Sequence, residues 1–481
     1  MSDPESLAVL DEIEIDLEQT VEIERPYFFQ LDVLKAIAIV FVVMDHSLTW
    51  EIKGAMGSTF WERLSIPFFL IVMGFNLAYS FKYSGATTLR ELYSKAYFKG
   101  KIARYVFPFA VLYMGSIVIG LYTGLLNFNE HTLLGFLPFW GPGNWFIALL
   151  FGSIVVFPAL YWLFEKQPSL TLGLCFLAEI ILQAIMYLWF PYPPYGVYPP
   201  LEGFIVSAIR VSVFFFLPAI GLGLWLSKGY DIRDQRNWFI IPYFLISAFF
   251  MFDYVTGFFR SMPNGFGYTI AWIQNFIRGD YTLLFYGYAA VLFIVTMINL
   301  PQQASGRAQK YVQQVGKASY HILLFQIFWM GIVYYWISID AATYHYIPDF
   351  AVQLGWSTEL MYIPFYLLNL TVSFGGGLLW YKAEKKAEKT GKPWYQHVWM
   401  RRTGLLFSAI MSIVLMGMSL ELIAEYMGLN YWAEHYGSFF ILNEVTGPGV
   451  MASFFAILFW IGFCMACLYK AFSIDDDEFP L

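Results

Sequence analysis

The sequence has little charge and few cysteines. Only 13% of its 481 residues are Asp, Glu, Lys or Arg, against roughly one quarter in soluble domains, whereas 59% are hydrophobic. This composition excludes a soluble globular class and predicts an integral membrane protein. The three cysteines, Cys175, Cys464 and Cys467, all lie in apolar runs, which excludes a disulfide framework. Cys464 and Cys467 have no second ligand pair nearby, so we interpret them as buried packing residues and expect no metal site.

The sequence also lacks a basic signal peptide at its start and any polar interval long enough to fold separately. The first 24 residues and the "DDDE" near the end are acidic and are predicted to be solvated tails. Neither tail suggests nucleic acid as a partner. We therefore expect a single structural unit, embedded in lipid.

Apolar runs of about 20 residues, the length that crosses a bilayer, predict an all-α bundle of about twelve transmembrane helices. The runs lie near 28–50, 64–84, 104–126, 144–165, 168–189, 203–227, 237–257, 281–300, 318–338, 358–382, 403–425 and 446–470. The predicted units are a cytoplasmic tail at 1–27, a ten-helix core at 28–385, a basic loop at 386–402, two additional helices at 403–470 and a second tail at 471–481.

Lys and Arg are distributed unevenly between the two sides of this bundle. If the amino terminus is cytoplasmic, the cytoplasmic tails and loops hold 22 of the 28 Lys and Arg residues, and the outer loops hold four. Lys35 and Arg210 lie within helices. The asymmetry predicts a multi-pass protein of the cell membrane with both termini in the cytoplasm.

The first predicted helix, "FFQLDVLKAIAIVFVVMDHSLTW", carries ionisable residues that lipid disfavours. Lys35 and His46 are eleven residues apart, which places them about 20° apart around a helix and about 16 Å apart along it. Asp32 precedes Lys35 by three residues and can pair with it. Ionisable groups in membrane helices usually face a bundle interior and serve function. From spacing alone, a functional polar stripe and a structural ion pair with a buried histidine are equally supported.

Six sequence motifs, which follow one another in the family's order, resemble those of the membrane acyltransferase 3 family. Together they cover roughly residues 27 to 385. They are the Lys35 and His46 pair; "IPFFLIVMGFNLAYSF" with Phe68, Phe69 and Gly74; "YFKGKIARYVFPF" with Lys99, Lys101, Arg104 and Pro108; "GNWFIALL" with Asn144, Trp145 and Phe146; "IRVSVFFFLPAIGLGLWL" with Arg210, Gly221 and Gly223; and "VGKASYHILLFQIFW" with Gly316, Ser319 and Tyr320.

The resemblance implies that an acyl group, often acetyl, passes from cytoplasmic acyl-CoA to a hydroxyl of a glycan or glycolipid on the other side. Acyl-CoA would be a co-substrate rather than a permanently bound cofactor. His46 would act as general base or as a transient acyl carrier, because its pKa lies near working pH. Asp45 is a candidate to orient His46, or else a polar lining residue. Many family members carry histidine where this chain has Gln326, so a proton-transfer role is lost there.

The resemblance also implies CoA binding by Lys35, Lys101 and Arg104, with Asn144 and Trp145 as a pocket wall. The alternatives are ordinary positive-inside anchors and interfacial tryptophan. Arg210, Ser319 and Tyr320 are candidates for acceptor binding, although for Arg210 a structural pair with Glu179 is the simplest expectation.

Three further expectations concern structure. Gly74, Gly221 and Gly223 are predicted to permit close helix packing. His321 is interpreted as a histidine at the cytoplasmic start of the ninth helix, and "RSMPNGFGYTIAWIQN" as an aromatic-rich outer loop.

The alternative function is a secondary transporter of a small polar solute, which twelve helices with scattered charges would suit. Transporters often have two similar halves, and the Lys35 and His46 arrangement has no counterpart in the second half. The predicted partners are therefore acyl-CoA, a sugar or glycolipid acceptor, and membrane lipids.

Overall fold

The computed structural model is helical throughout the part of the chain that it describes, with no strand there. It describes residues 26–48, 50–123, 143–191, 200–336, 358–389 and 447–472, and seven single positions between 402 and 416. The helices of the first half are α2 (Phe29–Ser47), α3 (Trp50–Ala55), α4 (Ser58–Lys82), α5 (Leu89–Leu92), α6 (Lys95–Lys101), the π-helix η1 (Ile102–Val106), α7 (Phe107–Thr123), α9 (Trp145–Lys166), α10 (Pro168–Trp189) and α11 (Pro200–Val211).

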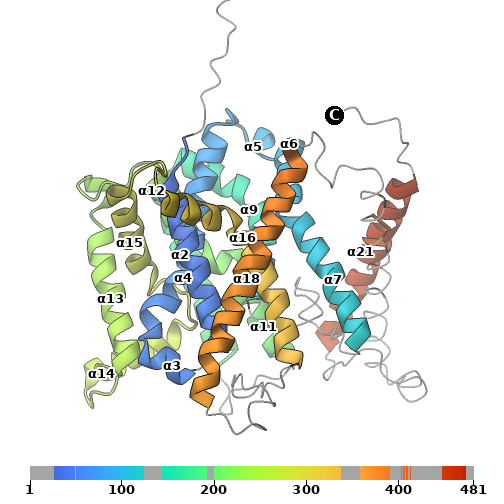
Figure 1. The fold of residues 1–481 in the computed structure, drawn as a ribbon. Coiled ribbons are helices and arrows are strands. Elements are labelled where there is room, and N and C mark those ends of the chain that lie inside the picture. Colours follow the sequence, from blue (N-terminus) through green and yellow to red (C-terminus); the bar gives the residue numbers. More distant parts are fainter. Residues whose placement is uncertain are drawn as a thin grey trace, which may run out of the picture.

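The second half continues with helices of more varied length. They are the 3-10 helix η2 (Val213–Phe216), α12 (Leu217–Ser227), the 3-10 helix η3 (Gln235–Asn237), α13 (Ile240–Thr256), α14 (Gly265–Phe276), α15 (Tyr286–Asn299), α16 (Arg307–Trp336), α18 (Thr358–Lys389) and α21 (Gly447–Phe472). Figure 1 shows α2 and α4 in the middle of the bundle and α21 at one edge.

Four described helices are long and apolar enough to cross a membrane, judged by length and composition: α4, α9, α10 and the stretch Gln235–Thr256 that contains α13. The segments Ile205–Val211 and Val213–Ser227 make a fifth if the 47° bend between them lies within one span. The all-helical class and the membrane character are thus confirmed, whereas the count of twelve stays a prediction. Most of the expected span at 403–425 lies outside the described residues.

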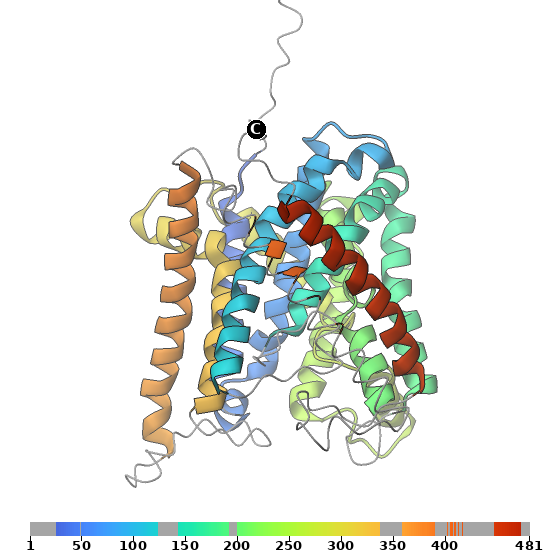
Figure 2. The same cartoon turned by 90° about the vertical axis from the view of Figure 1, so that its right-hand side faces the viewer.

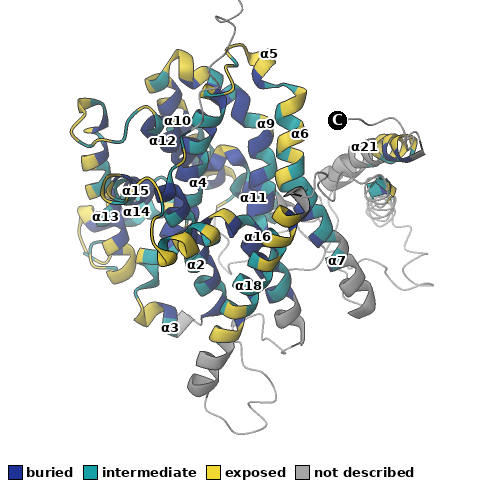
Figure 3. Ribbon diagram, turned by 45° about the horizontal axis from the view of Figure 1, so that its top comes forward, coloured by how far each residue is buried: buried dark blue, intermediate teal, exposed yellow. Residues whose placement is uncertain are grey.

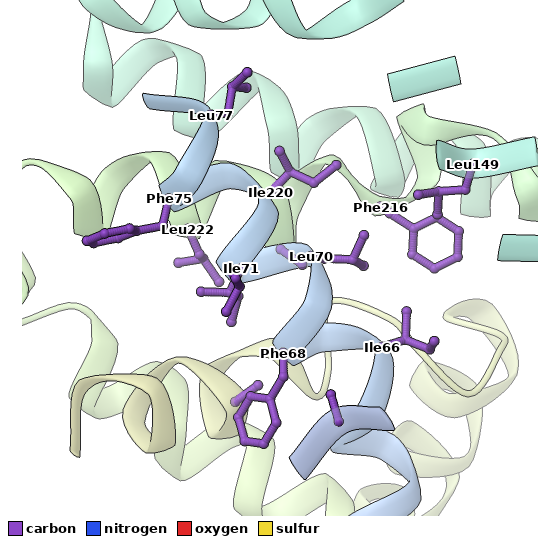
Figure 4. Packing of buried hydrophobic residues seen from close by; sticks show 14 of the residues in the cluster. Ile66, Phe68, Leu70, Ile71, Phe75, Leu77, Leu149, Phe216, Ile220 and Leu222 are labelled. Atoms are coloured by element: carbon purple, nitrogen blue, oxygen red, sulfur yellow. The ribbon is translucent and has the colours of Figure 1, made fainter. Parts of the chain in front are cut away.

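The centre of the bundle is built on α4, which packs against α2 and α12, and on α16, which packs against α2 and α18. Figure 4 shows Leu70, Ile71 and Phe75 of α4 beside Ile220 and Leu222 of α12; all five side chains are completely buried. Buried residues concentrate in this centre, whereas α5 and α6 present exposed residues at one end (Figure 3).

Glycines bring α4 and α12 into backbone contact. A Cβ atom on Gly74 would overlap the carbonyl of Ile220, and one on Gly223 would overlap the carbonyl of Ile71. A Cβ atom on Gly221 would lie 3.1 Å from the Cys175 sulfur of α10. The predicted role of these three glycines in close helix packing is confirmed.

Two expectations about helix bounds were wrong. The outer segment that was expected to be a loop contains α14, whose N-cap Asn264 accepts a hydrogen bond from the backbone N–H of Gly267 at 2.9 Å. Helix α16 begins at Arg307, well before the apolar run at 318, so His321 lies inside this helix rather than at its start.

Candidate active site

A cavity of about 720 Å³ lies among α2, α4, η1, α9, α16 and α18, a size that suits a small-molecule site. Lys35, Lys101 and Arg104, which the sequence analysis assigned to one ligand, all line it. Ser319 and Tyr320 line it as well, so these two residues share the cavity with the basic groups rather than forming a separate site.

Basic side chains outnumber acids in the cavity lining. Lys35, Lys101, Arg104, Lys317 and Lys385 are basic, and two residues, Asp32 and Glu384, are acidic. Lys35 Nζ lies 2.5 Å from Asp32 Oδ1, which confirms the predicted pair. The excess of positive charge favours an anionic ligand.

Local structure positions the other two predicted cations. The π-helix η1 follows α6 directly and carries Arg104, and π-helical segments are frequent at functional sites. Lys101 Nζ lies 5.5 Å from the ring centre of Tyr97, and the Arg104 guanidinium lies 5.5 Å from that of Tyr105. Burial raises the pKa of the Tyr97 hydroxyl, so this phenol stays neutral beside the lysine.

Tyr320 joins η1 to α16. Its hydroxyl donates a hydrogen bond to the backbone carbonyl of Tyr105 at 2.7 Å, and the two rings meet edge to face. The contact fixes one wall of the cavity next to Arg104. Tyr320 therefore stabilises the cavity wall, and this structural role does not depend on a bound ligand.

His46 is not among the residues that line the cavity. Its Cε1 is 3.1 Å from the position that a Cβ atom on Gly143 would occupy, and Leu323 Cδ1 is 3.8 Å from the same position. Leu323 also lines the cavity. The imidazole therefore lies near Leu323, a residue of the cavity wall.

Three neighbouring polar side chains have buried atoms without a hydrogen-bond partner among the described residues. These atoms are Nδ1 of His46, both amide atoms of Asn144 and both amide atoms of Gln326. Asn144 adjoins Gly143, and Gln326 lies beside the His46 ring. Buried polar groups are nearly always satisfied, so a cluster of unsatisfied ones marks a place where water or a ligand binds.

Asp45 does not hydrogen-bond to His46. Its Oδ2 lies 3.8 Å from His46 Nε2, which exceeds hydrogen-bond length, and its Oδ1 pairs with Lys53 Nζ of α3. Asp45 influences the imidazole through its charge rather than by holding the ring.

Trp145 stands outside the cavity, in a stack of aromatic rings. Its ring centre lies 5.6 Å from that of Phe216 and 5.9 Å from that of Tyr281, and both pairs are stacked. Neither Asn144 nor Trp145, the two residues predicted to form a pocket wall, is among the lining residues, whereas the next residue, Phe146, lines the cavity.

The expected pair of Arg210 and Glu179 is wrong. Glu179 Oε1 accepts a hydrogen bond from the backbone N–H of Leu283 at 2.8 Å, and Arg210 Nε is buried without a hydrogen-bond partner among the described residues. Ser212 adopts an extended backbone, with φ −68° and ψ 143°, so α11 ends before α12 and the span bends between them.

A buried pair of polar side chains in the cavity wall, His321 and Glu384, was not predicted from the sequence. His321 Nε2 of α16 lies 2.5 Å from Glu384 Oε2 of α18, and each side chain is only 9% exposed. Both residues line the cavity. They are 63 residues apart, so no local pattern could reveal the pair, although a histidine and a glutamate in neighbouring membrane-length helices are a weak signal.

The fold and the site together define a membrane protein of several spans with a basic internal cavity and a buried polar cluster near it. The family model described as an acyltransferase domain matches residues 28–378, which is most of the chain. The chain therefore belongs to the acyltransferase 3 family, and the protein is a membrane acyltransferase. No curated protein and no solved structure matched the chain.

Proposed function

We propose that the protein transfers an acyl group from acyl-CoA, bound in the cavity, to a hydroxyl on the opposite side of the membrane, with His46 as general base. The observation that carries the proposal is one cavity that gathers Lys35, Lys101 and Arg104 and whose lining residue Leu323 lies near His46. Acetyl is the expected acyl group, and a surface glycan or glycolipid is the expected acceptor.

The charges of the cavity support a CoA ligand. CoA carries a 3′-phosphate and a diphosphate, which charge-assisted hydrogen bonds from Lys and Arg bind well where water is partly excluded. Lys101 and Arg104 are four and seven residues after Tyr97, on the short helical segment that opens the third span. Phosphates held there would direct the thioester toward Phe146 and Leu323.

The proposed reaction step uses the unpartnered atoms around His46. The acceptor oxygen attacks the thioester carbonyl carbon while His46 Nδ1 takes the hydroxyl proton, and the carbonyl π electrons move to oxygen. The side-chain N–H groups of Asn144 and Gln326 would stabilise that oxyanion. When the intermediate collapses, the carbon–sulfur bond breaks and the CoA thiolate takes the proton back from His46.

The acceptor is proposed to approach from the side of α3, where Asp45 and Lys53 form an ion pair. Arg63 extends this polar region: its guanidinium donates to the backbone carbonyl of Asp280 at 2.8 Å and lies over the ring of Tyr254. Charged and aromatic groups together suit a sugar hydroxyl.

The test is steady-state turnover of labelled acetyl-CoA by the purified full-length protein. His46→Ala should lower turnover by roughly 10²- to 10⁴-fold, the contribution of a general base, without raising KM for acetyl-CoA. The double variant Lys101→Gln and Arg104→Gln should raise KM while turnover at saturation changes little.

Lys99→Gln is the matched control, because Lys99 is exposed on the same helix and does not line the cavity. An equal rise in KM for this variant would show that Lys101 and Arg104 affect KM only through the general positive charge of the surface. Unchanged turnover in His46→Ala would exclude the base, and solute transport without any CoA requirement would favour a secondary transporter.

A further inference from the structure

A second basic groove lies beside the cavity, where the ends of α16 and α18 meet. It has a volume of about 340 Å³ and is lined by Gln314, Leu378, Tyr381, Lys382, Lys385 and Lys386. Lys382 and Lys386 are exposed, belong to this groove alone and form no ion pair with any residue that the structure describes. The acyl-CoA cavity therefore does not account for these two lysines.

Helical geometry puts the lysines on one face of α18. Successive residues advance by about 100°, so Lys382, Lys385 and Lys386 span an arc of about 100°. Glu384 lies about 200° from Lys382, on the other side, where it pairs with His321. Glu384 therefore does not neutralise this basic face.

The same face continues along α18 as an apolar, outward strip. Leu379, Leu368 and Leu367 lie within about 60° of Lys382 around the helix and are 69%, 46% and 54% exposed. Gly375 lies between them, and a Cβ atom there would meet nothing within 4 Å. In Figure 2, α18 stands at the left edge of the bundle. An exposed strip of leucines on a helix at the edge of a membrane bundle suits contact with lipid chains.

The dimensions of this face match one lipid molecule. Lys382 and Leu367 are fifteen residues apart, about 22 Å along the helix, which exceeds the roughly 15 Å half-thickness of a bilayer core. The lysines follow directly after Trp380 and Tyr381, and such aromatic residues mark the membrane interface. Basic pockets at this depth bind anionic lipid head groups.

We propose that the groove between α16 and α18 binds an anionic phospholipid, with its phosphate on Lys382, Lys385 and Lys386 and an acyl chain along Leu379, Gly375 and Leu368. Tyr381 and Lys385 line both the groove and the acyl-CoA cavity. A lipid in the groove would thus contact the same wall as the donor substrate. The binding site itself does not depend on the proposed reaction.

The test measures lipid binding to the purified full-length protein in neutral detergent by native mass spectrometry. The probes are phosphatidylglycerol and phosphatidylcholine of equal chain length. Phosphatidylglycerol should bind more tightly, and Lys382→Gln with Lys386→Gln should weaken it roughly tenfold or more, since each such lysine contributes about 1 kcal/mol.

The matched control is Lys82→Gln with Lys95→Gln, two exposed lysines at the end of α4 and the start of α6 that do not line the groove. This control should bind phosphatidylglycerol like the unaltered protein, and all variants should keep the same thermal midpoint. Equal binding of the two lipids, or unchanged binding in the groove variant, would overturn the proposal.

A parallel titration with CoA tests whether the groove binds the phosphates of CoA instead of the phosphate of a lipid. If the groove variant loses affinity for CoA and keeps its affinity for phosphatidylglycerol, the groove holds the nucleotide and the lipid proposal is wrong. Loss of lipid binding with intact CoA binding supports it. Loss of turnover in His46→Ala is independent of both results.

Discussion

At the scale of single residues, two buried glutamines differ in whether their side-chain amides form hydrogen bonds. Gln183 exchanges two hydrogen bonds with the backbone of Arg278, at 2.9 Å and 3.0 Å. Gln326 is equally buried and has no hydrogen bond at either amide atom among the described residues. An unsatisfied buried amide lowers stability, and such a group is retained where it serves a ligand or a reaction.

The first prediction compares Gln326→Leu with Gln183→Leu. Gln326→Leu should lower turnover by roughly 10²- to 10³-fold, the effect of removing one oxyanion donor, while stability stays equal or rises. Gln183→Leu should lower the free energy of unfolding by about 1–3 kcal/mol, because the Arg278 backbone groups lose their partners. Turnover and thermal midpoints measure both effects. Full activity in Gln326→Leu would remove this amide from the mechanism.

Local geometry made part of the site predictable. The Asp32 and Lys35 pair follows from a spacing of three residues in a helix, and the common cavity of Lys35, Lys101 and Arg104 follows from the family resemblance. The His321 and Glu384 pair was not predictable, because it depends on how α16 and α18 pack. The proximity of His46 to Leu323 in the cavity wall likewise depends on how α2 and α16 pack.

At the scale of helices, α4 and α12 can pack closely because two positions at their contact are glycines, which have no side chain. Gly74 and Gly223 each face a backbone carbonyl of the opposite helix. The two helices bury the centre of the largest hydrophobic cluster, which includes Ile71 and Ile220. Any added carbon must push the helices apart and open gaps in that cluster.

The second prediction is that Gly74→Ala destabilises the protein by more than about 1 kcal/mol, because overpacking shifts the backbone. Gly173→Ala is the control: Gly173 lies within α10, and a Cβ atom there meets nothing within 4 Å. Alanine should leave stability equal there or raise it by up to about 1 kcal/mol. Thermal unfolding in one detergent compares the two variants, and equal midpoints would contradict the packing account.

Apolar run length predicted most helices but not all of their bounds. The start of α16, "RAQKYVQQVGK", is polar and has no apolar run, so the sequence analysis placed the helix eleven residues too late. The bend at Ser212 arises within an apolar stretch and has no composition signal. α14 could have been found from Asn264, a favoured N-cap residue, followed by a helical stretch.

At the scale of the whole molecule, the distribution of Lys and Arg predicts which side each loop faces. The third prediction tests it by cysteine labelling in a variant without the three native cysteines. Ser261→Cys, between α13 and α14, should react with an impermeant maleimide on intact cells. Thr87→Cys, between α4 and α5, should react only after permeabilisation. Both residues are exposed. The reverse pattern would invert the orientation and place the basic cavity on the outer side.

Orientation decides the direction of the proposed transfer. With the predicted orientation, the cavity opens toward the cytoplasm, where acyl-CoA is available, and the Asp45 and Lys53 pair lies on the acceptor side. His46 lies near Leu323 of the cavity wall but does not line the cavity. Lining side chains would therefore have to move for the thioester to reach the imidazole.

The most direct test of the account is an experimental structure of the full-length protein with a non-hydrolysable acetyl-CoA analogue. The account predicts phosphate density against Lys101 and Arg104, and the acyl carbonyl in contact with His46 and Gln326. An analogue bound elsewhere, or one whose acyl group does not contact His46, would contradict it.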